Sequence, residues 1–151
     1  MYYTVGEVAK KLDIAPSALR YYDKEGLLPF IERSNGGIRV FSDKDFSSLA
    51  VIECLKKTGM SIKDIKRFMD MAAKGDETID ERLELFKKQR QSVKAQIEEL
   101  EETLETLEFK CWYYETSKAA GTTAYVDNMS LKDMPEKYAK TKIKMDQIIE
   151  K

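Results

Sequence analysis

The most constraining feature of the sequence is an apolar repeat that runs from Leu83 to Tyr114. From Val93 onward the apolar positions are separated by alternating steps of four and three residues, and only Arg90 interrupts the same register upstream. A period of about 3.5 residues sustained over about four heptads is typical of a coiled-coil helix. The repeat consists of Leu83, Phe86, Val93, Ile97, Leu100, Leu104, Leu107, Cys111 and Tyr114.

This repeat also predicts an oligomer. The segment from Asp80 to Ser117 contains no Gly or Pro, so we expect one helix of roughly 57 Å at about 1.5 Å per residue. Its apolar seam is costly to leave in water, and the chain has no second heptad segment of comparable length. We therefore predict a homodimer in which the helix pairs with its own copy. A long helix packed on its own domain is the alternative, and the heptads leave parallel and antiparallel pairing open.

Composition and charge suit a two-part molecule. The 151 residues are enough for one domain plus an extension. Residues 1–75 carry 13 Lys and Arg against 10 Asp and Glu, whereas residues 76–151 carry 13 against 17. A mildly basic first half and an acidic second half suit a nucleic-acid-binding head with a dimerising tail.

Several classes of protein are disfavoured by what the sequence lacks. No apolar run approaches the roughly 18 residues of a membrane span, and the first residues do not resemble a secretory signal. We expect a cytoplasmic protein with no membrane contact, whose two cysteines remain thiols. The absence of histidine excludes Ser-His-Asp and Cys-His catalysis and every zinc site that contains histidine. We predict no catalytic residues, no cofactor and no metal site.

The helix boundaries are marked by capping signals. A hydroxyl residue with a carboxylate three positions later, as in Thr4 and Glu7, is typical of a helix start. Pro16 marks another start, and glycines such as Gly59 are well placed to end helices. These signals predict a mainly α fold with helices at about 4–12, 16–25, 43–57, 61–74, 78–119 and 130–149.

The first half of the chain predicts a winged helix-turn-helix. Only the segment 13–15 separates the first two helices, which is the short turn of that motif. The segment 35–37, Asn-Gly-Gly, separates the β-prone segments 31–33 and 38–41 and predicts a hairpin. The expected core comprises Val5, Val8, Ala9, Leu12, Ile14, Leu19, Leu27 and Leu28.

The second predicted helix carries a polar face suited to a DNA groove. Ser17, Arg20, Tyr21 and Lys24 lie mostly on one side, with Leu19 on the other. These side chains offer a guanidinium fork, an ammonium and hydroxyls that reach bases or phosphates. An ordinary solvated helix face is the alternative, and charge and spacing alone do not decide between the two.

Three segments of this half resemble the N-terminal signature of MerR-family transcription regulators. They are Thr4–Ala9 (TVGEVA), Leu19–Pro29 (LRYYDKEGLLP) and Gly37–Phe41 (GIRVF). The resemblance continues through Gly59–Ile62 and the long helix, so that it covers about residues 3–117. It implies a DNA-binding domain over residues 1–75, a dimerisation helix over 76–118 and a C-terminal tail over 119–151 that is a candidate effector region.

The resemblance also implies a mechanism. Family members are homodimers whose long helices pair antiparallel. They bind pseudo-palindromic promoter operators and activate transcription by bending and untwisting DNA, with RNA polymerase as the expected partner there. By match to the motif, Arg20 and Tyr21 are expected in the major groove with Tyr22 and Ser17 assisting. Arg39 and Arg33 are expected at phosphates, and Thr4 is expected to present a helix N-terminus to a phosphate.

The effector is less constrained by the sequence. Cys54 resembles the single cysteine of a subgroup that responds to aldehydes and other electrophiles, and nearby Lys56 and Lys57 favour a thiolate. Ordinary packing is the alternative for Cys54 and the preferred interpretation for Cys111. The tail is expected to fold back on the long helix. A regulator with a non-covalent effector, a coiled-coil adaptor whose head binds protein, and a thiol enzyme using Cys54 are the remaining alternatives.

Overall fold

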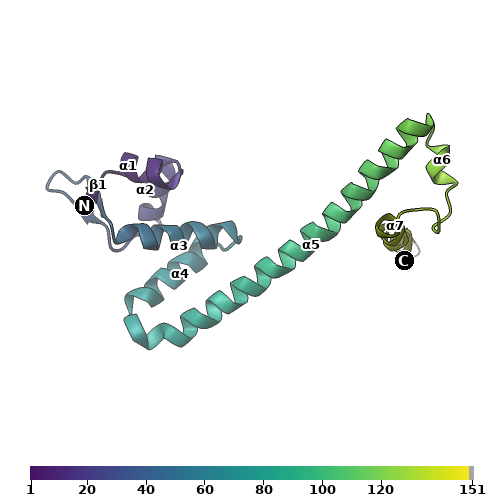
Figure 1. The fold of residues 1–151 in the computed structure, drawn as a ribbon. Coiled ribbons are helices and arrows are strands. Elements are labelled where there is room, and N and C mark those ends of the chain that lie inside the picture. Colours follow the sequence, from purple (N-terminus) through teal and green to yellow (C-terminus); the bar gives the residue numbers. More distant parts are fainter. Residues whose placement is uncertain (150–151) are drawn as a thin grey trace. The chain divides into compact units, whose positions relative to one another are not determined.

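The computed structural model describes residues 1–149 and divides into a first unit, Met1–Val93, and a second unit that begins at Lys94. Figure 1 labels most of the elements along the chain. The first unit contains β1 (Tyr2–Tyr3), α1 (Val5–Leu12), α2 (Pro16–Lys24), β2 (Glu32–Arg33), β3 (Arg39–Ser42), α3 (Asp45–Lys57), α4 (Ile62–Ala73) and the short 3₁₀ helix η1 (Gly75–Thr78). Helix α5 (Ile79–Ala120) continues into the second unit, which also contains α6 (Ala124–Asp127) and α7 (Glu136–Ile149).

Helices α1 and α2 form the predicted helix-turn-helix. Thr4 and Glu7 make a complete capping box, in which the Thr4 amide donates to Glu7 Oε2 at 2.7 Å and the Glu7 amide donates to Thr4 Oγ1 at 3.4 Å. Asp13 ends α1 with a left-handed backbone (φ +53°), and Pro16 begins α2. The starts of α1 after Thr4 and of α2 at Pro16 agree with the sequence signals because each depends on local chemistry.

The predicted hairpin is present, and we call β2, β3 and their connecting turn the wing. β2 pairs antiparallel with β3, so that Arg33 lies opposite Arg39. The turn closes where the Ser34 amide donates to the Ile38 carbonyl at 2.9 Å, with Gly37 at φ +75°. Strand β1 was not predicted. It pairs with the other edge of β3 and makes a sheet of order β1-β3-β2.

The core of the first unit joins the helix-turn-helix to α3 and α4. In Figure 1 the helix-turn-helix and α4 lie on opposite sides of α3. Of the predicted core residues, Val5, Leu12 and Ile14 are only partly buried. The remaining predicted residues are fully buried beside apolar side chains of α3, α4 and β3. The buried set includes Val8, Ala9, Leu19, Tyr22, Leu27, Leu28, Phe41, Leu49, Ile52, Leu55 and Ile65.

The first turns of α5 belong to the first unit. The Phe86 ring meets Phe68 of α4 edge to face at 5.3 Å between centroids, and Leu85 packs against the core. At the corner before α5, Arg82 Nη2 donates to the Gly75 carbonyl at 2.7 Å, while Thr78 Oγ1 donates to the Met71 carbonyl at 2.6 Å. These contacts hold α4 and the start of α5 together.

In the second unit, the tail folds back on α5 as predicted. Tyr138 of α7 stacks on Trp112 with centroids 5.0 Å apart, and Phe109 is buried beside them. Lys137 binds Glu108 at 2.6 Å, and Lys144 binds Glu105 at 2.9 Å.

The helix predicted over residues 130–149 begins later than expected, and the short helix α6 was not predicted. Ser130 Oγ donates to Asp133 Oδ2 at 2.7 Å in a separate turn, and α7 begins only at Glu136, after Pro135. Proline has no amide hydrogen and restricts the residue before it, so the helix cannot extend back through this point. Within residues 1–149, no helix combines the length and apolarity needed to cross a bilayer.

Candidate nucleic-acid interface

Helix α2 presents the polar face that the sequence predicted. Ser17, Arg20 and Tyr21 are exposed, and Tyr21 has 47% of its surface accessible. Leu19 and Tyr22 lie on the opposite side and are fully buried. We call Ser17, Arg20 and Tyr21 the reading face. Residues three or four apart share one side of a helix, so these three side chains point the same way.

Tyr22 is not available to DNA, which corrects the prediction that it assists at the groove. Its hydroxyl donates to Glu53 Oε1 at 2.5 Å and accepts a bond from Lys56 Nζ at 3.0 Å. Burial, followed by the bond to the Glu53 carboxylate, raises the pKa of Tyr22 above its usual value. Tyr22 therefore anchors α2 to α3.

The wing arginines are paired with a residue that the sequence analysis missed. Asp23 Oδ2 accepts from Arg39 Nε at 2.6 Å and from Arg33 Nη2 at 2.8 Å. Both guanidiniums therefore lie beside the end of α2, and in this structure they bind a carboxylate of the same chain. Their predicted contacts with phosphates remain a prediction.

Thr4 acts as a helix cap in this structure. The bonds that the Thr4 amide and hydroxyl donate to the Glu7 carboxylate lower the pKa of Glu7. That carboxylate lies at the start of α1, where the family resemblance predicts a DNA phosphate. A phosphate contact by Thr4 remains a prediction.

Most of the predicted dimer seam is exposed in the single chain. Leu100 is 67% exposed, Phe86 is 38% exposed beside Phe68, and Val93 is partly buried. Cys111, which the sequence analysis placed in the seam, is an exposed free thiol, and so is Cys54 on α3. The exposed large seam side chains are Leu83, Phe86, Ile97, Leu100, Leu104, Leu107 and Tyr114.

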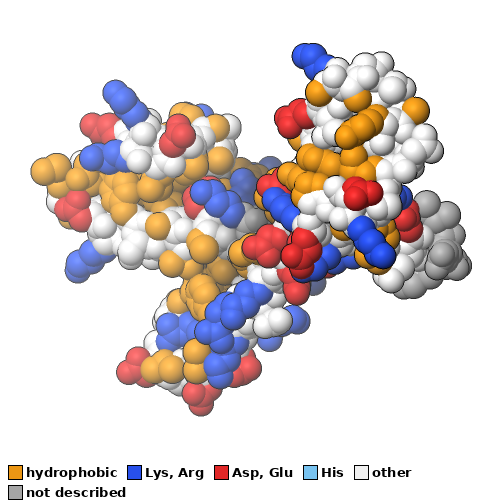
Figure 2. Space-filling model, turned by 45° about the vertical axis from the view of Figure 1, so that its right-hand side comes forward, with side chains coloured by type: hydrophobic (Ala, Val, Ile, Leu, Met, Phe, Trp, Pro, Cys, Tyr) orange, Lys and Arg blue, Asp and Glu red, His pale blue; other side chains and the backbone are white. Residues whose placement is uncertain are grey.

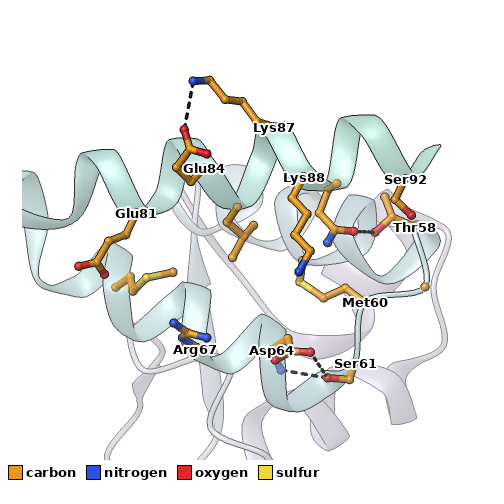
Figure 3. Close-up of a pocket in the computed structure, with 14 residues that line it drawn as sticks. Thr58, Met60, Ser61, Asp64, Arg67, Glu81, Glu84, Lys87, Lys88 and Ser92 are labelled. Carbon is orange, nitrogen blue, oxygen red and sulfur yellow. Dashed lines mark hydrogen bonds and ion pairs between the residues drawn. The ribbon is translucent and has the colours of Figure 1, made fainter. Parts of the chain in front are cut away.

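A charged groove of about 960 Å³ lies in the first unit between the α3–α4 turn, α4 and α5. Figure 2 shows Lys and Arg side chains gathered over α4 and the start of α5. In Figure 3, Lys88 extends from α5 toward Met60, whereas Lys87 points away and binds Glu84 at 3.1 Å. In the part of the chain that the structure describes, no three His, Cys, Asp or Glu side chains are grouped as metal ligands would be.

The comparisons with known proteins agree with this geometry. The family model "MerR HTH family regulatory protein" matches residues 3–72, and the model "MerR, DNA binding" matches residues 46–108. An uncharacterised HTH-type transcriptional regulator of Haemophilus influenzae is 48% identical over 136 residues, which are 90% of this chain and 98% of that protein.

Two solved structures are also similar. One is the crystal structure of HiNmlR, a MerR-family regulator lacking the sensor domain, bound to promoter DNA; it is 49% identical, with a TM-score of 0.75, over 83% of this chain and 99% of that chain. The other is a MerR-family regulator from Bacillus thuringiensis, 44% identical with a TM-score of 0.69, over 74% of this chain and 97% of that chain. The chain therefore belongs to the MerR family of helix-turn-helix proteins, which are DNA-binding transcription regulators and not enzymes.

Proposed function

We propose that the protein is a homodimeric, sequence-specific regulator that binds a pseudo-palindromic promoter operator and activates transcription by distorting the DNA. The observation that carries the proposal is the reading face of α2 next to the wing. Arg20 and Tyr21 are exposed there, while Tyr22 holds the helix in place from behind. The similarity to HiNmlR, whose structure contains promoter DNA, supports the same interpretation. Ser17 assists at the groove, and the wing arginines and Thr4 contact phosphates.

Dimerisation through α5 follows from the exposed seam. Fully burying one Leu side chain contributes about 1.5–3 kcal/mol relative to leaving it in water. Leu100, Leu104 and Leu107 are each more than half exposed, so a second copy that covers them stabilises the pair considerably. We propose the antiparallel orientation of the family, which places one helix-turn-helix at each end of the paired helices.

Two heads on a stiff pair of helices suit activation by distortion. Two heads can engage successive major-groove turns about 34 Å apart. Deforming a site of this length costs on the order of several kcal/mol, so a small change in the separation of the heads decides whether the DNA deforms. Distortion of a promoter acts on RNA polymerase bound there, and we propose the polymerase as a partner on this basis.

For regulation, we propose that Cys54 captures aldehydes or other electrophiles. Its thiol is exposed on α3. On the same helix, Glu53 accepts a hydrogen bond from the Tyr22 hydroxyl, and Lys56 donates one to that hydroxyl. When the thiolate adds to an aldehyde carbon, a C–S bond forms, the C=O π bond breaks with its electron pair moving to oxygen, and that oxygen takes a proton from water to give a hemithioacetal. An adduct there acts next to the bonds that hold α2.

A regulator with a non-covalent effector is the second candidate. Two hollows favour it: the groove beside α4 and α5, and a smaller hollow of about 220 Å³ beside Phe109 and Tyr113 in the second unit. An effector in the groove would contact α4 and α5 without needing Cys54, so a response that survives removal of the thiol identifies this case.

The DNA-binding proposal is tested by fluorescence anisotropy. The probes are a duplex that the wild-type protein selects from a random-sequence library and an unselected duplex of equal length. We expect binding to weaken steeply with salt and Arg20→Ala to lose about 10- to 100-fold of selected-duplex affinity, as expected for one base contact worth about 1–3 kcal/mol. Arg67→Ala is the matched control, because it removes the same charge from an exposed position on α4. Salt-insensitive capture of a protein with no DNA retention would instead favour the adaptor.

A further inference from the structure

We infer that Asp23 is a positioning residue that fixes the wing against the reading face and lowers the affinity of the protein for DNA of arbitrary sequence. The inference rests on the proposed function, in which the reading face and the wing both contact DNA. It concerns a carboxylate bonded to the two arginines that are proposed to contact phosphates, where a negative charge opposes phosphate binding. The contacts of Asp23 explain why such a charge is useful at this position.

A single carboxylate oxygen joins three elements. Asp23 lies in the last turn of α2, and its Oδ2 accepts from Arg33 at the end of β2 and from Arg39 at the start of β3. The two arginines are direct partners across the strand ladder. The helix that carries the reading face and both strands of the wing are therefore held by the same atom, and the distance from bases to wing phosphates depends on it.

The two ion pairs of Asp23 differ in burial, and therefore in how much each contributes. The Asp23 side chain is 16% exposed and that of Arg39 is 24% exposed, whereas that of Arg33 is 53% exposed. An exposed ion pair contributes little, while a shielded charge that loses its partner is costly. The bond to Arg39 is thus the one that holds the wing, and the bond to Arg33 mainly balances charge.

The charge balance affects DNA binding directly. Like charges that lie opposite each other on neighbouring strands destabilise the pairing, and Asp23 neutralises one of the two positive charges of Arg33 and Arg39. The cluster therefore offers a net single positive charge to the DNA. Each phosphate neutralised contributes a slope of about 0.9 in the dependence of log affinity on log salt, and this contribution does not depend on sequence.

The variant Asp23→Asn tests the inference because it keeps the shape of the side chain and removes its charge. With the selected and unselected duplexes, we expect affinity for the unselected duplex to rise about threefold to tenfold and its salt slope to steepen by about one. We expect affinity for the selected duplex to fall, so that discrimination between the two drops at least tenfold. Loss of folding would lower both affinities, and the opposite directions identify a positioning role.

Glu25→Gln is the matched control. Glu25 is exposed at the end of the same helix, and among the described residues it makes no ion pair with the wing. If charge alone acts, Asp23→Asn and Glu25→Gln both raise affinity for both duplexes and both leave discrimination unchanged, and the inference is overturned. If Asp23 positions the wing, only Asp23→Asn lowers discrimination, and Glu25→Gln leaves it within about twofold of wild type.

Hydrogen exchange of the wing, measured on the full chain without DNA, separates the inference from the proposed function. We expect Asp23→Asn to speed exchange of the Ser34 amide, which bonds to Ile38 across the turn, at least tenfold, while Glu25→Gln leaves it unchanged. Unchanged protection in Asp23→Asn overturns the inference even if the protein binds DNA. Suppose that Asp23→Asn loosens the wing but the wild-type protein selects no duplex. Asp23 then has only a structural role, and both its role in specificity and the proposed function are overturned.

Discussion

The hydroxyl of Tyr22 lies 2.5 Å from Glu53 Oε1 and donates a hydrogen bond to it, joining the back of α2 to α3. Because Lys56 donates to the same hydroxyl, one buried oxygen satisfies a carboxylate and an ammonium. The neighbouring Tyr21 projects to the surface. Two adjacent tyrosines in the same helix thus have separate tasks, since Tyr21 belongs to the reading face and Tyr22 fixes its orientation.

Tyr22→Phe is expected to lower the free energy of unfolding by about 1–2 kcal/mol, because Glu53 and Lys56 lose a hydrogen-bond partner while the buried ring stays in place. Chemical denaturation monitored by circular dichroism measures this difference. Tyr125→Phe, at a tyrosine that is 56% exposed, is the control and should change stability by less than about 0.5 kcal/mol. Equal stability of Tyr22→Phe and wild type would show that the bond contributes nothing net.

Leu100→Lys is expected to weaken the homodimer at least tenfold while leaving helix content unchanged, because each copy loses an apolar seam contact and places an ammonium group in the seam. Sedimentation over a range of protein concentrations measures the dissociation constant. Ala95→Lys introduces the same residue at an exposed position outside the seam and should sediment like wild type. A wild-type chain that is monomeric at micromolar concentration contradicts the proposed dimer itself.

Cys54→Ser is expected to retain DNA binding and to lose activation by aldehydes in a transcription assay, because the hydroxyl is a much weaker nucleophile than the thiolate. Mass spectrometry of the aldehyde-treated protein should find the adduct on the peptide that contains Cys54. Cys111→Ser removes the other exposed thiol and should respond like wild type. An undiminished aldehyde response in Cys54→Ser favours a non-covalent effector.

Glu7→Gln is expected to lower the melting temperature at neutral pH and to have no effect at strongly acidic pH. Bonds from the Thr4 amide and hydroxyl lower the pKa of Glu7 below its usual value near 4.5. The ionised carboxylate therefore stabilises the fold above that value, and the contribution is lost as the pH falls through the lowered pKa. Melting curves between pH 7 and pH 3 should show the two proteins converging. A constant gap would mean that charge on Glu7 is irrelevant to the cap.

The elements that the sequence predicted well are those set by neighbouring residues. The capping box at Thr4, the start at Pro16 and the hairpin turn before Ile38 each depend on a few adjacent side chains. The start of α7 was predicted too early because Ser130 and Asp133 close a separate turn, and the helix begins only after Pro135.

The parts that were missed depend on contacts between distant residues. Asp23 bonds to residues 10 and 16 positions away, and nothing in the local pattern indicates those partners. Tyr22 and Tyr21 are the same residue type, so their different exposure follows only from the packing of α2 on α3. The spacing of Leu19 and Tyr22, three residues apart on one side of the helix, was the available signal that Tyr22 is buried.

The edge-to-face contact of Phe86 with Phe68, together with the Arg82 bond to Gly75, has a practical consequence for cutting the protein into pieces. A fragment that stops at residue 75 lacks Phe86, which contacts Phe68, and lacks Arg82, which donates to the Gly75 carbonyl. A fragment that continues to Val93 keeps these contacts. Anyone who wishes to crystallise the DNA-binding part alone should therefore include the first turns of the long helix.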